Sequence, residues 1–312
     1  AARRLTPPAA RGQPLTRDRH IRRKRHERMV MPAQELSLGI TLAVLGAGLL
    51  HASWNAMLKS APGGDPMLVT ASVVAGSSVC ALVLLPFAGV PGPAAWKFIA
   101  GSSAVHFAYY ITLAHAYRTG DLSFAYPLMR GTAPLLVTVL GIVFLHELPT
   151  THVAAGIVLI CAGIVSIAFV RRDRHPPAAA AWAFANAAII AVYTLIDGGG
   201  ARASGDAIAY VTWLIFLEGL PFLAWIAWRR GRPAIAYVSR GWRRGMLGGA
   251  CSLAAYGIVL FAMTRAPIAA VAALRETSVL FAALIGAVWL KEGLGPMRLA
   301  GAASVVAGVA AL

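Results

Sequence analysis

The sequence predicts an all-α integral membrane protein in which ten transmembrane helices form two inverted five-helix repeats. Composition is the first observation: 58% of the residues are hydrophobic and 13% are charged, whereas soluble domains carry about 25% charged residues. Length is the second, because five stretches free of Asp, Glu, Lys and Arg approach or exceed the roughly 20 residues that cross a bilayer as a helix. These stretches are Leu36–Leu58, Pro66–Trp96, Phe98–Tyr117, Leu148–Val170 and Gly245–Thr264. An internal repeat is the third.

Pro, Gly and charged residues divide the apolar segments into ten helices with short loops, as expected for neighbouring antiparallel helices. The longest loop, from Arg229 to Arg244, is strongly basic. The predicted spans are residues 36–58, 67–90, 96–117, 122–145, 152–170, 178–197, 206–228, 245–264, 267–290 and 296–312.

The internal repeat has a constant shift of 145 residues and needs no gap. It aligns two intramembrane arginines, two glutamates that follow helices, and several glycines. The matched pairs include Arg130/Arg275, Glu147/Glu292, Gly156/Gly301 and Gly163/Gly308. Five helices are an odd number, so the second copy must cross the bilayer in the opposite sense. The predicted units are residues 36–170 and 178–312, and inverted repeats of this kind are typical of secondary transporters.

The same residues resemble the EamA type of the drug/metabolite transporter superfamily. The resemblance rests on the proline-containing fourth helix that ends in Leu-His-Glu-Leu (145–148), on Leu-Lys-Glu-Gly (290–293) in the second copy, and on the opening helix with Trp54. It covers about residues 36–312 and implies ten helices from a duplicated five-helix unit. Members move amino acids, aromatic compounds, sugars or nucleotide sugars, so the resemblance implies transport without naming a substrate.

We therefore predict a secondary transporter, with export as the expected direction, that moves a small polar metabolite across the inner (plasma) membrane. The substrate is expected to be anionic or amino-acid-like. The alternative is an intramembrane enzyme acting on a lipid or a small molecule, but the sequence has no His-Glu-x-x-His, acidic metal cluster or nucleophile elbow. It also has no phosphate-binding loop for ATP-driven transport. Cys80, Cys161 and Cys251 lack metal-ligand spacing, so we predict no metal and no cofactor.

The net charge of +16 would suggest a nucleic-acid partner in a soluble protein. Here the basic residues lie in the N-terminal tail and in short loops, which indicates topology signals and contacts with lipid headgroups. The predicted partners are thus a small-molecule substrate and membrane lipids, not nucleic acid, and homodimer formation is left open.

Orientation can be predicted from the loops. Those after the odd-numbered helices carry thirteen Lys or Arg residues, against three in the loops after the even-numbered ones. The positive-inside rule places the first set in the cytoplasm and both termini outside it. The resemblance implies cytoplasmic termini instead, so their orientation stays open.

The two ends of the chain carry separate expectations. Residues 1–30 hold ten Lys or Arg and form either a disordered basic tail or a segment upstream of a functional start at Met31. Fourteen residues follow Arg298, which as a helix span about 21 Å, short of the roughly 30 Å of hydrocarbon. We therefore expect the native gene to continue for a few apolar residues.

A charged side chain at membrane depth costs about 2.5–3.5 kcal/mol on insertion scales, so each one is expected to have a functional or structural role. Arg130 and Arg275 occupy matching places in the fourth and ninth helices. Either they face a central cavity and bind an anionic substrate group, or they pair internally with backbone carbonyls, Glu218 or Glu276. Glu218 is the predicted proton-coupling group, because burial disfavours a charged carboxyl. Its alternative is a structural partner for an arginine.

Further substrate contacts are predicted on the first and third helices. His51 and Asn55 are four residues apart and share a helical face. A polar and aromatic stripe on the third helix suits a cavity for small polar molecules; it consists of Ser103, His106, Tyr110 and Tyr117. We select His51, Asn55, His106 and Tyr110 as substrate-binding, with hydrogen-bonded packing as the alternative for the histidines.

The remaining polar residues are weaker candidates or structural ones. Asp197 is expected to end the sixth helix at Gly198-Gly199-Gly200, and Glu276 adjoins Arg275. Glu147 and Glu292 are predicted to tie a loop to the next helix. The glycine pairs seven residues apart predict close helix contact, and Pro127 and Pro134 predict kinks in the fourth helix.

Overall fold

The structure, a computed structural model, describes residues 36–59, 65–120, 122–169, 176–289 and 296–312. These residues form helices and no β-strand. The first half contains α2 (Leu38–Lys59), α3 (Pro66–Ala88), the short η1 (Pro93–Ala95), α4 (Trp96–Thr119), α5 (Leu122–Leu140), the π-helical turn η2 (Gly141–Leu145) and α6 (Thr151–Phe169). The second half contains α7 (Pro177–Ser204), α8 (Ala207–Arg240), α9 (Trp242–Met263), α10 (Ile268–Arg275), α11 (Ser278–Trp289) and α12 (Pro296–Ala311).

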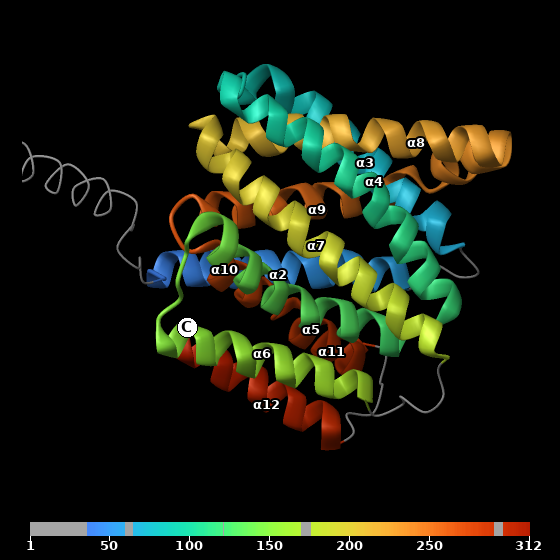
Figure 1. Cartoon of the computed structure of the whole chain (residues 1–312). Coiled ribbons are helices and arrows are strands. Elements are labelled where there is room, and N and C mark those ends of the chain that lie inside the picture. The colour runs from blue at the N-terminus through green and yellow to red at the C-terminus, as the bar shows by residue number, and fades with distance from the viewer. Residues whose placement is uncertain (1–35, 60–64, 121, 170–175, 290–295) are drawn as a thin grey trace, which may run out of the picture.

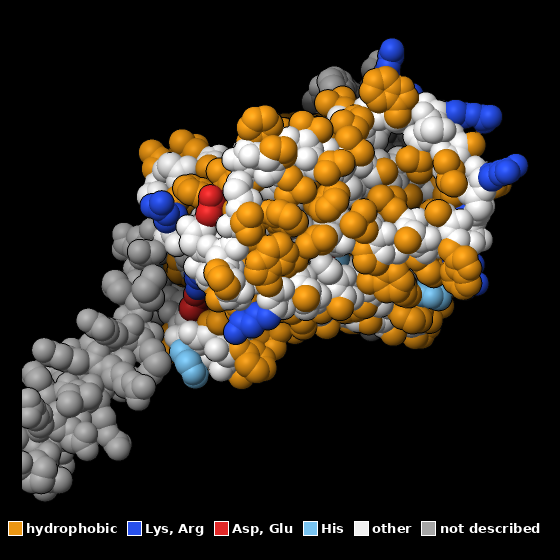
Figure 2. Space-filling model, turned by 90° about the horizontal axis from the view of Figure 1, so that it is seen from above, with side chains coloured by type: hydrophobic (Ala, Val, Ile, Leu, Met, Phe, Trp, Pro, Cys, Tyr) orange, Lys and Arg blue, Asp and Glu red, His pale blue; other side chains and the backbone are white. Residues whose placement is uncertain are grey.

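The helices have the lengths and surfaces of a multi-pass membrane protein. Six are long and apolar enough to cross a bilayer, and two shorter apolar helices lie at Leu38–Trp54 and Leu299–Ala311. Large apolar side chains are exposed around the bundle, among them Phe87 at 83% and Val306 at 60%. Figure 2 shows a broad hydrophobic surface between two ends that carry the charged side chains. A surface of this kind matches hydrocarbon rather than water.

The helices run side by side as a bundle (Figure 1). In that view α2 passes through the middle, with α3 and α8 above it and α6 and α12 below. The packing pairs are α3 with α8 and α9, α4 with α7, α2 with α9 and α11, and α6 with α5 and α12. Elements of the first half therefore pack mainly on elements of the second, so that the two halves share one core.

Repeat-related glycines face one another where α6 meets α12. A Cβ atom at Gly163 would lie 2.6 Å from the carbonyl oxygen of Gly301, and a Cβ at Gly301 would lie 2.6 Å from that of Gly163. Gly156 and Gly308 have the same reciprocal relationship, at 2.8 and 2.7 Å. The predicted close contact is thus confirmed, and its physical basis is the absence of side chains on both surfaces.

The predicted end of the sixth helix was wrong. Its three glycines do not terminate it, and α7 continues to Ser204. A Cβ at Gly198 would lie 2.5 Å from Ile268, and one at Gly200 would lie within 2.5 Å of the ring of Tyr210. Glycine weakens a helix, but here it allows neighbouring helices to approach α7 closely.

The basic segment after residue 228 is also helical rather than a loop. The helix α8 runs to Arg240 and bends at Gly231, whose φ of 60° and ψ of −149° depart from helical values. Glycine adopts such a conformation without a Cβ penalty. Pro233 then lies near the start of the second helical segment, where proline is tolerated.

The ninth predicted helix, residues 267–290, is interrupted at Glu276 and Thr277. The backbone N–H of Glu276 donates to Ala273 and that of Thr277 to Leu274, so three-residue spacing replaces the α-helical ladder. The Thr277 hydroxyl also donates to the Leu274 carbonyl at 2.8 Å. The result is two short helices, α10 and α11, with Glu276 held in the turn between them.

Candidate functional site

A cavity of about 210 Å³ lies inside the bundle. Its walls come from α2, α3, α4, α5, α7, α8, α9 and α10, while no described residue of α6 or α12 lines it. The lining residues of α3 and α5 belong to the first halves of those helices, and those of α4 belong mainly to the second half. The cavity therefore lies toward the end of the bundle where α2 and α4 terminate.

The two repeat-related arginines meet at one carboxylate on the cavity wall. The Nε of Arg130 lies 2.6 Å from Oε2 of Glu276, and the Nε of Arg275 lies 3.5 Å from Oε1. Arg130 and Arg275 line the cavity and are 7% and 6% exposed, while Glu276 is fully buried. The sequence presented two alternatives for Arg130 and Arg275, a place on the cavity wall or internal pairing with Glu276. In the structure the two occur together.

The charges of this triad do not cancel. Two guanidinium groups face one carboxylate, so the triad carries one net positive charge at neutral pH. The Nη2 atom of Arg130 is buried and has no hydrogen-bond partner among the described residues. A buried donor of this kind is costly unless a further acceptor reaches it. The triad can therefore accept an anionic group from the cavity.

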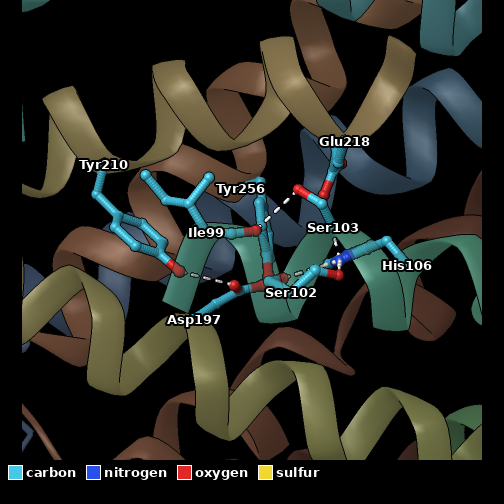
Figure 3. A network of polar contacts seen from close by, with 8 residues as sticks. All are labelled: Ile99, Ser102, Ser103, His106, Asp197, Tyr210, Glu218 and Tyr256. Carbon is cyan, nitrogen blue, oxygen red and sulfur yellow. Dashed lines mark hydrogen bonds and ion pairs between the residues drawn. The ribbon is translucent and has the colours of Figure 1, made fainter. Parts of the chain in front are cut away.

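A second polar cluster forms where α4 meets α8 (Figure 3). His106 Nδ1 lies 3.2 Å from Oε2 of Glu218 and 3.0 Å from the hydroxyl oxygen of Ser102. The His106 ring also lies against Tyr193, with 4.2 Å between ring centroids. Both His106 and Glu218 line the cavity. The charged or titratable side chain that Glu218 contacts among the described residues is therefore a histidine and not an arginine.

Asp197 extends the polar region on the side of α7 (Figure 3). It is fully buried. The Tyr210 hydroxyl donates to its Oδ1 at 3.0 Å, and the Tyr256 hydroxyl donates to its Oδ2. Because Tyr256 lines the cavity, Asp197 influences the wall through this tyrosine rather than by direct contact.

Aromatic rings cover much of the remaining wall. Tyr110 stacks on Phe222 with centroids 4.3 Å apart, and it contacts the edge of Tyr109. Tyr109 in turn lies edge-on to Tyr193 at 5.7 Å. Rings packed against each other in this way offer a preformed surface with a few hydroxyl groups, which is typical of small-molecule sites.

The predicted contacts are distributed as follows. His51 and Tyr110 line the cavity together with His106. Ser103 does not: its hydroxyl donates to the Ile99 carbonyl within its own helix at 2.8 Å. The side chain of Asn55 lies outside the described residues.

Sequence reasoning missed Tyr193 and Tyr256, which line the cavity in the middle of α7 and α9. Their position in the chain was a usable signal. Tyrosines of membrane proteins collect at the bilayer surfaces, so a tyrosine at the centre of a span indicates an internal polar partner or a cavity.

At the other end of the bundle, Arg202 joins four segments. Its Nε donates to the Met263 carbonyl at 2.7 Å, and its Nη2 donates to the Ala266 carbonyl at 2.9 Å. Its Nη1 pairs with Glu147, whose second oxygen accepts the N–H of Ile268 at 3.1 Å. We name this set the Arg202 clamp. It agrees with a structural role for Glu147, while Glu292 lies outside the described residues.

The described residues contain no group of three His, Cys, Asp or Glu side chains that could hold a metal ion. Cys80, Cys161 and Cys251 are free thiols. The polar groups at the cavity are guanidinium, carboxyl, imidazole and phenol, together with the hydroxyl groups of Thr70, Ser77 and Ser252, the amide of Asn186 and the indole of Trp54.

Comparison with known families matches the chain to the EamA-like transporter family over residues 37–169 and 177–312. The chain belongs to the EamA-like transporter family. The resemblance inferred from the sequence motifs is confirmed, and each half of the chain carries one copy of the family unit. This EamA-like protein is accordingly an all-helical membrane protein of a transporter family.

A solved structure described as "Crystal structure of protein" is similar to the EamA-like protein, with a TM-score of 0.68 and 17% sequence identity. The match covers 88% of this chain and 96% of that one. At this identity the similarity shows a shared fold. Comparison with curated protein sequences gives no match.

Proposed function

We propose that the EamA-like protein is a secondary transporter that exports a small polar metabolite with an anionic group across the inner membrane. In this proposal ten spans cross the bilayer, with α10 and α11 together forming the ninth. The observation that carries it is the meeting of Arg130 and Arg275 on Glu276 at the cavity wall. A substrate carboxylate or phosphate would supply the second anion that the two arginines lack.

An amino-acid-like substrate has additional support from the rest of the wall. Glu218 lines the same cavity as the arginine pair and can face a substrate ammonium group. Its contact with His106 also gives it a partner for a proton, so the same carboxyl serves the proposed proton coupling. The tyrosine surface between these charged groups suits the body of a small molecule.

Alternating access follows from the inverted repeats. The cavity lies toward one end of the bundle, and the Arg202 clamp joins helix ends at the other. We propose that the clamp holds that end closed in the conformation described here. Opening it while closing the opposite end would expose the arginine pair to the other side of the membrane.

Transport in proteoliposomes tests the proposal. The purified protein should accumulate radiolabelled anionic or zwitterionic metabolites, recovered chemically unchanged, and should not accumulate their neutral analogues. Arg130→Ala and Arg275→Ala should each abolish accumulation without lowering the yield of folded protein, because each leaves one arginine paired with Glu276. Arg118→Ala, at the end of α4, is the matched control. Loss of folded protein in both cavity variants, or chemical conversion of the solute, would contradict the proposal.

A further inference from the structure

A second hollow, separate from the substrate cavity, lies on the surface of α3, α8 and α9. Its volume is about 370 Å³, within the usual range of about 300–1,000 Å³ for ligand pockets. Ala71 and Ala75 of α3 line it, and so do residues on both sides of the Gly231 bend, such as Ala227 and Ile235. The bend therefore brings two segments of α8 to one groove.

The inside of this groove is apolar. Ser72 and Ser239 are its hydroxyl-bearing residues, and both hydroxyls donate within their own helices, to Leu68 at 3.0 Å and Ala236 at 3.1 Å. Among the described residues, no charged one lines the groove. Ile235 and Trp242 on its walls are each 58% exposed. Such a groove takes hydrocarbon more readily than a polar metabolite.

Around the bend the chain carries a cluster of arginines. All six are exposed: Arg229, Arg230, Arg232, Arg240, Arg243 and Arg244. Arg230 pairs with Asp65 at 2.9 Å, and no described carboxylate pairs with the other five. Figure 2 shows basic side chains projecting from the right-hand end of the molecule, the end that the bend of α8 reaches in Figure 1.

Tryptophans mark the depth of this cluster in the membrane. Arg229 lies over the ring of Trp228 and Arg243 over that of Trp242, each with 5.6 Å from the guanidinium carbon to the ring centroid. Exposed tryptophan beside arginine is typical of the boundary between hydrocarbon and headgroups. The apolar groove thus lies next to several cations at headgroup depth that no described carboxylate neutralises.

We propose that this groove binds one anionic phospholipid, with an acyl chain in the groove and the phosphate headgroup among the arginines of the bend. A zwitterionic lipid would place its own cation against the same cluster, so the complementary ligand carries net negative charge. This site is independent of the transported substrate, because its residues do not contribute to the substrate cavity.

Native mass spectrometry of the full-length protein in detergent tests the site. Dioleoyl phosphatidylglycerol should be retained in preference to dioleoyl phosphatidylcholine. The double variant Arg240→Gln/Arg243→Gln should weaken phosphatidylglycerol binding about 30-fold, since each arginine near an anionic surface contributes about fivefold. Ala227→Phe should lower retention of the lipid chain itself, because the added ring occupies the groove wall.

The matched control is Arg265→Gln, which removes an exposed arginine stacked on Phe261 outside the groove. It should retain phosphatidylglycerol like the unmodified protein. Equal retention of the two lipids, or equal loss in the control and in the double variant, would overturn the proposal. If the double variant elutes as aggregate, Arg229→Gln/Arg232→Gln provides the same test at two positions without a described ion pair.

Discussion

Glu147 bridges Arg202 and the first turn of α10, because one carboxylate oxygen pairs with the guanidinium while the other accepts the N–H of Ile268 at 3.1 Å. This single side chain therefore connects the segment after η2 to the end of α7 and the start of α10. No other described carboxylate makes an equivalent connection between the two halves at this end.

Loosening this bridge should open that end of the bundle. In Glu147→Gln, a cysteine placed at Val259 on the cavity wall should react faster with an impermeant maleimide added from the clamp side. Arg202→Gln should have the same effect. The double variant should be labelled little faster than either single variant, because residues in direct contact are coupled by about 0.5–3 kcal/mol. Unchanged labelling rates would show that the clamp does not control access.

Replacement of Glu276 should act on stability rather than on transport alone. Glu276→Gln leaves two arginines buried without an anion, and loss of one partner from a buried ion pair typically costs about 3–5 kcal/mol. The thermal unfolding midpoint should fall accordingly. Adding Arg130→Gln to this variant should recover stability, because it removes one of the uncompensated cations. An unchanged unfolding midpoint in Glu276→Gln would contradict this prediction, since it would mean that water in the cavity solvates the two arginines.

Glu218 is expected to couple transport to protons. Glu218→Gln should still move substrate down its gradient but should lose accumulation driven by a pH gradient. The control is Asp206→Asn, a carboxylate that caps α8 by accepting the N–H groups of Ile208 and Ala209. Accumulation that survives in Glu218→Gln and collapses with a protonophore would assign the coupling to another group.

The basic residues between the apolar spans predict the orientation of the protein. Cysteines placed at Arg172 and Arg240 should be labelled from the cytoplasm, as the positive-inside rule requires. Labelling of both positions from the opposite side would instead place both termini in the cytoplasm.

The glycines between α6 and α12 should be sensitive to a single methyl group. Gly163→Ala places a Cβ 2.6 Å from the Gly301 carbonyl oxygen, and overpacking of this kind costs about 1–3 kcal/mol. At Gly101 in α4 an added Cβ would have no atom within 4 Å, so Gly101→Ala should be neutral or slightly stabilising. Equal unfolding midpoints for the two variants would show that α6 and α12 separate easily.

Much of this architecture could be predicted from the sequence. Apolar stretches of bilayer length and the 145-residue shift indicated the helices and the two units, because both signals can be found in the sequence without knowing which helices touch. The cost of charge at membrane depth drew attention to Arg130, Arg275 and Glu218, which line one cavity; their roles in transport stay predictions. The sequence left open whether the arginines pair internally, since pairing depends on a turn that no residue pattern marks.

The errors have a common physical origin. At Gly198 and Gly200 the helix continues, and side chains of other helices pack against it there: Tyr210 comes from the next helix, and Ile268 from a segment far away in the chain. The bend at Gly231 and the interruption at Thr277 are local backbone changes: Gly231 has a positive φ two residues before Pro233, and the Thr277 hydroxyl donates to the Leu274 carbonyl. Glycine permits both helical and non-helical backbone conformations, so a glycine in the sequence does not by itself say whether a helix continues, bends or ends.

The position equivalent to Glu276 in the first half is Gly131, since the shift of 145 residues joins them. If the two halves take on each other's conformations in the opposite access state, each arginine has a counterpart in the other half. Glu276 has none, because its equivalent position carries a glycine. We expect the two access states of the empty protein to differ in free energy, so that one of them is the resting state. Binding from the side that the resting state does not face then requires a change of state first, which lowers the apparent affinity there. The carrier would consequently saturate at different substrate concentrations on its two sides.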